Sequence, residues 1–242
     1  MSDYRDRLYS TYYSSHASAL YGDITIEEMR KRFRFFKSYF GQFLIVEKSA
    51  KILDIGSGIG KLILWLKELG YTNTTGIDIN EEQVKIANDL GISEVKHCDI
   101  VQYLGANKNG FDMIFAIDVI EHFRKDEILG VLELIYGALK ENGMFIIQVP
   151  NGESPFTGRY RYGDFTHEVA FTTTSISQLF RVIGFKDIVF KPAGPIPHGV
   201  ISVVKYVLWK VIEALLKTYM SVETGSSKGI FTQNIIAVGC KP

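Results

Sequence analysis

Short apolar runs alternate with amphipathic segments along the chain from residue 51 onward. Each run is rich in β-branched or aromatic residues, and apolar positions three or four apart follow it, which together predict strand–helix units. The predicted strands cover residues 51–55, 73–79, 94–98, 111–117, 144–149, 185–190 and 232–240. Because their apolar positions are nearly continuous, we expect the strands to be buried on both faces, as in a parallel sheet. The pattern therefore predicts a doubly wound α/β fold with helices on both faces of the sheet.

Helix start and stop signals lie between the predicted strands. Residues 80–91 predict a helix that Asn80 caps at its N-terminus, and residues 126–143 predict a longer amphipathic helix. We expect Thr173 or Thr174 to cap the next helix. The apolar face of the 126–143 helix is expected to hold Ile128, Leu132, Ile135 and Leu139.

Three regions do not follow the alternation of strands and helices, namely residues 1–50, 150–173 and 191–229. We interpret the whole chain, 1–242, as a single domain with residues 51–190 as its core and 230–242 as its final strand. Long segments around a regular sheet are where substrates are usually recognised, so these regions are expected to carry specificity.

The stretch LDIGSGIGKL, residues 53–62, leaves the first predicted strand and contains three glycines. A phosphate-binding P-loop needs glycine where Ile55 stands and a hydroxyl where Leu62 stands, so that motif does not fit. A dinucleotide fingerprint needs its third glycine where Lys61 stands, so that motif does not fit either. A glycine turn at a strand's carboxyl end lets a ligand approach the backbone closely. The pattern that remains is an acidic residue followed by alternating glycines, Asp54, Gly56, Gly58 and Gly60.

This pattern resembles motif I of class I S-adenosylmethionine-dependent methyltransferases. Asp78 ends the second predicted strand, where a carboxylate accepts both hydroxyls of a ribose, and Asp99 ends the third, where the family has an acid near the adenine amino group. The fourth strand continues as AIDVIEHF, which is similar to the family's segment after that strand in small-molecule and lipid methyltransferases. The alternative is that Asp54 and Asp99 only cap turns.

The resemblance implies a seven-stranded Rossmann-like methyltransferase sheet, mostly parallel, with the last strand antiparallel. It also implies S-adenosylmethionine as the cofactor. The residues expected to bind it are Asp54, Gly56, Ser57, Gly58, Gly60, Asp78, Ile79, Asp99, Ile100 and Ile117. The segment YGDFTHEVAFTTTSISQLFRVIGF, residues 162–185, resembles bacterial enzymes of the methyltransferase-23-like group, often from surface-polysaccharide and other glycan pathways.

Methyl transfer from a sulfonium is an in-line displacement, so alignment and exclusion of water supply much of the rate. A hydroxyl acceptor also benefits from a general base. The candidate catalytic residues are Glu121 and His122 after the fourth strand and His167 in the long 150–173 connection. Alternatively, these side chains only hydrogen-bond their own loops. A metal ion held by Asp118, Glu121 and His122 has little support in the sequence, and we expect no metal site.

The composition narrows the choice of partners. Formal net charge is zero, so no overall field favours nucleic acid, and no nucleic-acid partner is expected. The two cysteines, Cys98 and Cys240, form no zinc-site or disulfide pattern, which favours a reducing compartment. The N-terminus does not have the pattern of a signal peptide. We therefore expect a cytoplasmic protein.

Residues 200–220 predict an amphipathic helix with Lys210, Glu213 and Lys217 on one side. The opposite arc holds Val203, Val207, Trp209, Ile212, Leu216 and Tyr219. Three interpretations of this arc remain open, namely packing on the chain's own sheet domain, a homodimer contact, and peripheral contact with the inner face of a membrane.

Residues 27–40 predict a basic helix with Met29, Phe33, Phe36 and Phe40 along one side. We expect residues 1–50, helical and tyrosine-rich, to act as a lid over the cofactor cleft. The tyrosines are Tyr4, Tyr9, Tyr12, Tyr13 and Tyr21.

Together these features predict methyl transfer to a small-molecule or carrier-linked acceptor, with a sugar hydroxyl or similar oxygen as the acceptor atom, in a surface-glycan or secondary-metabolite pathway. A nicotinamide-dependent α/β oxidoreductase is one alternative, and Lys61 in place of the third glycine argues against it. A methyltransferase acting on RNA or protein is another. The sequence AIDVI stands where an Asn-Pro-Pro-Tyr-like motif would be expected, which weakens that case. A cofactor-binding module without catalysis is the third.

Overall fold

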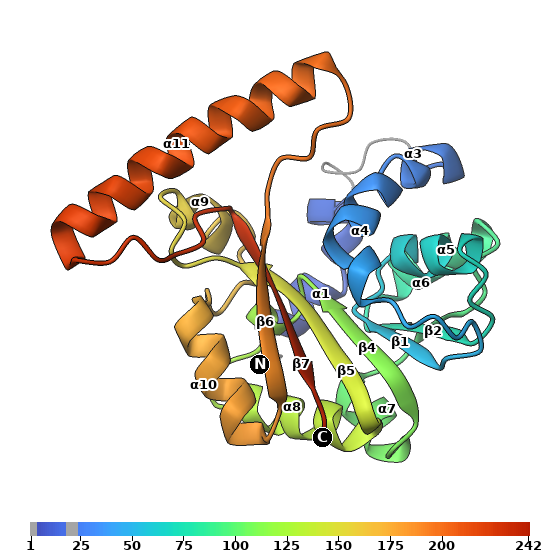
Figure 1. Ribbon diagram of the computed structural model, residues 1–242. Helices are drawn as coiled ribbons and strands as arrows, with labels where there is room; N and C mark the ends of the chain where they lie inside the picture. Colours follow the sequence, from blue (N-terminus) through green and yellow to red (C-terminus); the bar gives the residue numbers. More distant parts are fainter. Residues whose placement is uncertain (1–3, 18–23) are drawn as a thin grey trace.

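The computed structural model describes residues 4–17 and 24–242, and it consists of one twisted sheet with helices packed on both faces (Figure 1). The sheet has seven strands in the order β3-β2-β1-β4-β5-β7-β6. β7 pairs antiparallel with both β5 and β6, whereas the pairs among β1 to β5 are parallel. The strands are β1 Ile52–Ile55, β2 Thr74–Asp78, β3 Val95–His97, β4 Phe111–Ile117, β5 Leu139–Pro150, β6 Lys186–Ala193 and β7 Asn234–Cys240. The predicted fold, including the antiparallel last strand, is confirmed.

Alternate residues of the central strands enter two separate apolar cores, as expected for a sheet buried on both faces. In β4, Ile114 and Ala116 pack with α7, α8 and α10, whereas Met113 and Phe115 pack with α4 and α5 on the other face. A third cluster joins α3, α5 and α6 at the β3 edge. The helices of these layers are α3 Ile26–Arg30, α4 Phe33–Phe40, α5 Lys61–Glu68, α6 Glu81–Asp89, α7 Ile100–Ala106, α8 Ile128–Ala138 and α10 Thr173–Ile183.

Two of the predicted helix boundaries are wrong. The long helix ends at Ala138, and Leu139 is already extended and pairs with Phe111, so it belongs to β5 rather than to a helix face. The cap of α10 is Thr172 rather than Thr173 or Thr174. Its side chain accepts a hydrogen bond from the Ser175 N–H, and the Ser175 side chain accepts one from Thr172, which completes a capping box.

The predicted basic helix is divided into α3 and α4 by a turn at residues 31–32. The two pieces bury their side chains in different cores. Met29 packs against α5 and α6, whereas Phe40 packs against Phe115 of the sheet. One straight helix cannot point along both directions, so the chain changes course between them. A 3₁₀ turn, η2 Gly41–Phe43, then leads toward the first strand.

The N-terminal segment 4–17 lies across the carboxyl ends of the strands, attached by its own contacts. It contains α1 Tyr4–Tyr9 and a π-helical turn, η1 Tyr13–Ala17. Arg5 Nη1 donates to both carboxylate oxygens of Glu127 at 2.8 Å, and the backbone oxygen of Tyr9 accepts a 2.7 Å bond from the Asn80 amide. Tyr21, a tyrosine of the predicted lid, lies outside the described residues.

The long helix α11, Val200–Thr224, extends away from the sheet and its covering helices (Figure 1). None of its residues is buried, although Trp209 and Leu216 of the predicted apolar arc are half-buried. The half-buried side also carries Glu213, which pairs with Lys210 and Lys217. The side facing solvent is apolar, with Val200, Val204, Leu208, Val211, Leu215 and Val222 exposed. In the part of the chain that is described, no helix is long and apolar enough to cross a membrane.

Candidate active site

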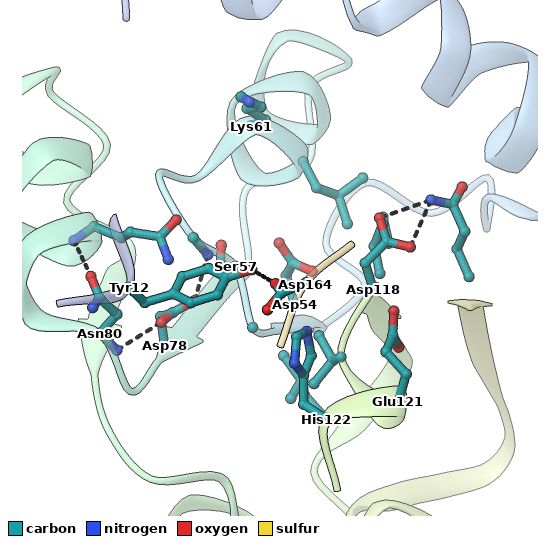
Figure 2. A pocket seen from close by; sticks show the side chains of 18 of the residues that line it. Tyr12, Asp54, Ser57, Lys61, Asp78, Asn80, Asp118, Glu121, His122 and Asp164 are labelled. Carbon is teal, nitrogen blue, oxygen red and sulfur yellow. Dashed lines mark hydrogen bonds between the residues drawn. The ribbon is translucent and has the colours of Figure 1, made fainter. Parts of the chain in front are cut away.

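A cavity of about 900 Å³ opens at the carboxyl ends of the strands, beneath the N-terminal segment (Figure 2). Ligands of open α/β sheets bind at this edge. Twelve of the thirteen residues predicted from the sequence line it. They are Asp54, Gly56, Ser57, Gly58, Asp78, Ile79, Asp99, Ile100, Ile117, Glu121, His122 and His167.

The turn after β1 requires glycine for steric as well as conformational reasons. Gly56 has φ +64°, and a Cβ there would lie 2.4 Å from a methyl carbon of Val119. Gly58 has φ +55°, and a Cβ there would lie 2.9 Å from the Gln83 side-chain oxygen. A side chain at either position would need both a rare backbone conformation and space that a neighbour occupies. The bare backbone therefore forms one wall of the cavity.

Gly60 does not line the cavity, unlike the other predicted residues. It precedes α5 with φ +78°, and a Cβ there would meet Val95 at 2.9 Å and Ile92 at 3.0 Å. Close packing of the helix start against the β3 edge explains this glycine. Because Gly60 alternates regularly with Gly56 and Gly58, the sequence predicted cofactor binding for all three. The turn places Gly60 away from the cavity.

Two carboxylates at the ends of β1 and β2 are buried beside this turn. Asp78 accepts bonds from the Gly58 N–H at 2.7 Å and from the Asn80 N–H at 2.8 Å, so the turn and the start of α6 share one acceptor. Burial raises the pKa of Asp78, although these bonds oppose the shift. Asp54 is 3% exposed, and burial, together with the nearby Asp78, raises its pKa to about 7. A positively charged ligand would offset the cost of two buried carboxylates.

Asp99 lines the cavity and also caps α7, since its side chain accepts a 3.0 Å bond from the Gln102 N–H. Asp99 therefore caps a helix, and its contact with the cofactor stays a prediction. The remaining oxygen of this exposed carboxylate is available to a ligand at the β3 end of the cavity.

The opposite wall of the cavity holds a chain of hydrogen bonds from Asp164 to His122. Asp164 accepts the Thr166 hydroxyl at 2.6 Å, and the Thr166 oxygen lies 2.9 Å from His122 Nδ1. Because the Thr166 proton is used on Asp164, His122 Nδ1 is the donor in the second bond, which leaves its Nε2 as an acceptor. Burial, followed by the neighbouring His167, lowers the pKa of His122 to about 4, so the ring is neutral at pH 7.

Glu121 and His167 lie next to His122. The His122 and His167 rings meet edge-to-face with centroids 4.7 Å apart, and His167 Nδ1 bonds to the Tyr160 carbonyl at 2.8 Å. Glu121 is 0% exposed, and neither of its carboxylate oxygens has a hydrogen-bond partner among the described residues. Its backbone oxygen accepts bonds from the Glu168 and Val169 N–H groups, which attaches the 150–173 connection to this wall.

The N-terminal segment completes this wall with residues that the sequence analysis assigned only to a lid. The Tyr12 hydroxyl donates to Asp164 at 2.6 Å, and the Tyr9 and Tyr12 rings each contact the His122 ring. Burial alone would raise the pKa of Asp164. The hydrogen bonds from Thr166 and Tyr12 act in the opposite direction, and the pKa is lowered. Arg32 and Lys61 also line the cavity and were not predicted. No local pattern marks these contacts, because their partners lie far apart in the sequence.

Comparisons with known proteins agree with the fold. Residues 26–189 match the family described as a methyltransferase domain, methyltransferase 23, and the chain belongs to this family. It is 24% identical over 199 residues to phosphoethanolamine N-methyltransferase of Plasmodium falciparum, covering 76% of this chain and 74% of that one. It is 30% identical over 186 residues to the mitochondrial ubiquinone biosynthesis O-methyltransferase of Rattus norvegicus, covering 72% of this chain and 45% of that one.

A solved structure shows the same fold. Haemonchus contortus phosphoethanolamine N-methyltransferase 2, in complex with S-adenosylmethionine, superimposes with a TM-score of 0.65 at 19% identity, covering 100% of this chain and 60% of that one. The protein is therefore an S-adenosylmethionine-dependent methyltransferase.

The cavity residues fit this cofactor chemically. S-adenosylmethionine carries a sulfonium and an ammonium, and the β1 and β2 ends offer the carboxylates of Asp54 and Asp78. The bare backbone at Gly56 and Gly58 leaves a cradle that a Cβ would fill. When bound, the cofactor supplies an activated methyl group.

Proposed function

We propose that the enzyme methylates an oxygen atom, a sugar hydroxyl or a similar group, of a small or carrier-linked acceptor. The observation that carries this proposal is the wall formed by Glu121, His122 and His167, opposite the glycine turn. A hydroxyl needs to lose its proton during methyl transfer, so it benefits from nearby basic groups, whereas an amine needs only alignment. The relative from Rattus norvegicus is an O-methyltransferase by name, which supports the same choice of atom.

In the proposed arrangement the two walls have separate tasks. The backbone at Gly56 and Gly58, with Asp54 and Asp78, holds the cofactor, and Asp78 grips its ribose. Asp99, with Ile79, Ile100 and Ile117, bounds the remainder of the cofactor. Segment 4–17 covers the cavity as a lid and excludes water, and its contacts with Glu127 and Asn80 keep it in place.

A direct test of the proposed acceptor class supplies the enzyme with labelled S-adenosylmethionine and two matched acceptor panels. One panel contains sugar nucleotides and lipid-linked sugars with free hydroxyls, and the other contains the corresponding amino sugars. We expect label in an ether bond to the hydroxyl acceptors. Label found only on nitrogen would contradict the proposal while leaving the methyltransferase assignment intact.

We also propose that α11 lies on a membrane surface and gives access to a lipid-linked acceptor in a surface-glycan pathway. The exposed apolar face of α11 is flanked on its edges by Lys205 and by Lys210, which pairs with Glu213, and this arrangement suits an interface with anionic headgroups. An in-plane helix of this kind stabilises binding by burying its apolar face in the headgroup region.

Flotation of the full chain with vesicles of anionic or neutral lipid tests this second proposal. We expect binding to the anionic vesicles, and loss of that binding in a Val204→Ser, Leu208→Ser, Leu215→Ser variant. A variant with Val46→Ser, an exposed apolar residue outside α11, serves as the control. A wild-type chain that fails to float but forms dimers through α11 would overturn the membrane proposal.

A further inference from the structure

We propose that Glu121, His122 and His167 form a binding site for one divalent first-row transition-metal ion, to which the acceptor oxygen also binds. One carboxylate oxygen and one ring nitrogen from each histidine lie within 4.8 Å of one another. The ion binding stands on this geometry alone, and its catalytic role rests on the function proposed above. The sequence grouped Asp118 with Glu121 and His122, whereas the fold replaces Asp118 by the remote His167.

The strongest indication of a metal-ion site is the environment of the buried Glu121 carboxylate. It is 0% exposed, and neither carboxylate oxygen meets a hydrogen-bond donor within the described part of the chain. Burying a carboxylate without a partner is costly, and buried charges are normally paired or coordinate a metal ion. Figure 2 shows the carboxylate of Glu121 close to that of Asp118, which adds negative charge rather than a partner. A cation at this position would remove the cost.

Both histidines are held with the same ring nitrogen available. His167 Nδ1 donates to the Tyr160 carbonyl, and His122 Nδ1 donates to the Thr166 oxygen, whose own proton is used on Asp164. Each ring therefore has its lone pair on Nε2. Metal-binding histidines commonly donate their other N–H to a carbonyl or toward a carboxylate, which fixes the tautomer and the ring orientation. Thr166, Asp164 and Tyr160 are the positioning groups of this site.

The donor set limits the identity of the ion. Two imidazoles and one carboxylate suit Mn²⁺, Fe²⁺, Co²⁺ or Zn²⁺, whereas Mg²⁺ and Ca²⁺ prefer sites made of oxygen alone. Three protein ligands leave coordination positions open toward the cavity, as in catalytic rather than structural sites. An acceptor hydroxyl, or a pair of neighbouring hydroxyls, fits these open positions.

Binding to the ion would lower the pKa of the acceptor hydroxyl, so that its proton passes to bulk solvent as the acceptor binds. The resulting alkoxide donates an electron pair to the methyl carbon as the carbon–sulfur bond breaks. The electrons of that bond pass to sulfur, so the sulfonium becomes a neutral thioether and the acceptor becomes a methyl ether. The ion changes neither charge nor oxidation state.

Titration of the chelator-treated full chain with Mn²⁺, followed by the electron paramagnetic resonance signal of free Mn²⁺, tests the site without any substrate. We expect the wild type to bind one ion per chain. Glu121→Gln and His167→Ala should weaken this binding at least tenfold. His198→Ala removes an exposed histidine outside the cavity and should bind as the wild type does.

Affinity for S-adenosylhomocysteine in the same variants reports whether the fold persists, and Glu121→Gln should keep it within about twofold. Equal Mn²⁺ affinity in the wild type and Glu121→Gln, or no binding by the wild type, would overturn the metal site. Ether formation at the full rate in excess chelator would overturn the catalytic role while leaving the proposed oxygen acceptor standing. Mn²⁺ binding without methylation of any hydroxyl would instead contradict the proposed function and leave the ion site intact.

Discussion

The two walls of the cavity are built in different ways. The wall formed by the β1 and β2 ends consists of short local turns, and its main carboxylate, Asp78, accepts two backbone N–H groups. The opposite wall brings together three segments that are remote in sequence, and its most buried carboxylate, Glu121, accepts nothing from the described residues. In the first wall Asp78 has its partners in the protein alone, whereas the Ser57 hydroxyl of that wall and the Glu121 carboxylate of the second have no hydrogen-bond partner among the described residues.

This difference fits a methyltransferase family whose members use one cofactor and different acceptors. Members with the same cofactor can share one wall, while the acceptor differs from enzyme to enzyme. The wall proposed to bind the cofactor depends largely on backbone geometry, which many sequences can supply. The wall proposed to meet the acceptor combines Glu121 and His122, from the turn after β4, with side chains from the long segments 1–50 and 150–173.

The largest expected effect concerns Asp54. Its pKa is raised to about 7 in the folded protein, from a usual value near 4, chiefly by burial. Between these values the folded state holds a proton that the unfolded state has lost, so folding free energy becomes less favourable as pH rises. Relative to Asp54→Asn, the wild type should lose roughly 4 kcal/mol between about pH 4 and pH 7.

Urea unfolding of both proteins across this pH range measures that difference. Parallel stability curves for wild type and Asp54→Asn would show that burial of Asp54 carries no such cost. A saturating cationic cofactor should reduce the difference, because it favours the charged carboxylate.

The second-largest effect is expected for His167, and it tests whether the two walls act independently. His167→Ala should lower turnover at saturating cofactor by about 100-fold or more, the scale for losing a group that activates the acceptor. Affinity for S-adenosylhomocysteine should change by less than about threefold, because His167 belongs to the other wall. Steady-state kinetics with calorimetry, and His198→Ala as the matched control, provide the measurement. Equal losses in turnover and cofactor affinity would mean that the walls are not independent.

Gly56 is where the two walls meet, since its neighbour Val119 belongs to the segment that carries Glu121 and His122. Gly56→Ala should destabilise the fold by about 2 kcal/mol, from a positive φ and the 2.4 Å contact with Val119. Adding Val119→Ala should recover part of this loss by removing the clash, while the backbone strain remains. Thermal unfolding of the single and double variants tests this, and complete absence of rescue would refute the steric contact.

The smallest effect is expected on α11, which neither wall uses. Leu208→Ser should change the free energy of unfolding by less than about 0.5 kcal/mol, because the side chain is exposed. Leu132→Ala, in the buried face of α8, should cost about 2–5 kcal/mol. Denaturant titration compares the two, and a large loss at Leu208 would mean that this helix packs on the domain after all.

The sequence predicted the first wall far better than the second, for a physical reason. Asp54, Asp78 and the turn glycines lie at strand ends, where local periodicity fixes their place. Gly60 shows the limit of this reasoning. The backbone changes direction within the tight turn, so only Gly56 and Gly58 of the three evenly spaced glycines line the cavity. Helix 126–143 was predicted too long because the apolar spacing continues smoothly past Ala138, where strand pairing takes over.

The second wall depends on contacts that no local pattern encodes. His122 and Thr166 are 44 residues apart, and Tyr12 and Asp164 are 152 apart. The sequence identified Glu121, His122 and His167 as candidates on loops at the cofactor's edge, without indicating that their ligand atoms lie within 4.8 Å of one another. It also left the placement of the apolar arc of α11 open. In the fold, Trp209 and Leu216 of that arc are half-buried, whereas Val203, Val207, Ile212 and Tyr219 are exposed.

The most direct test of the central claim, that this sheet edge binds the cofactor, is calorimetry with S-adenosylhomocysteine on the wild type and on Asp78→Ala. The wild type should bind one molecule per chain, and the variant should lose roughly 1–3 kcal/mol of binding free energy, the scale for a lost hydrogen bond to a buried charged group. Equal affinity in the two proteins would remove Asp78 from the site and contradict the assignment of this wall to the cofactor.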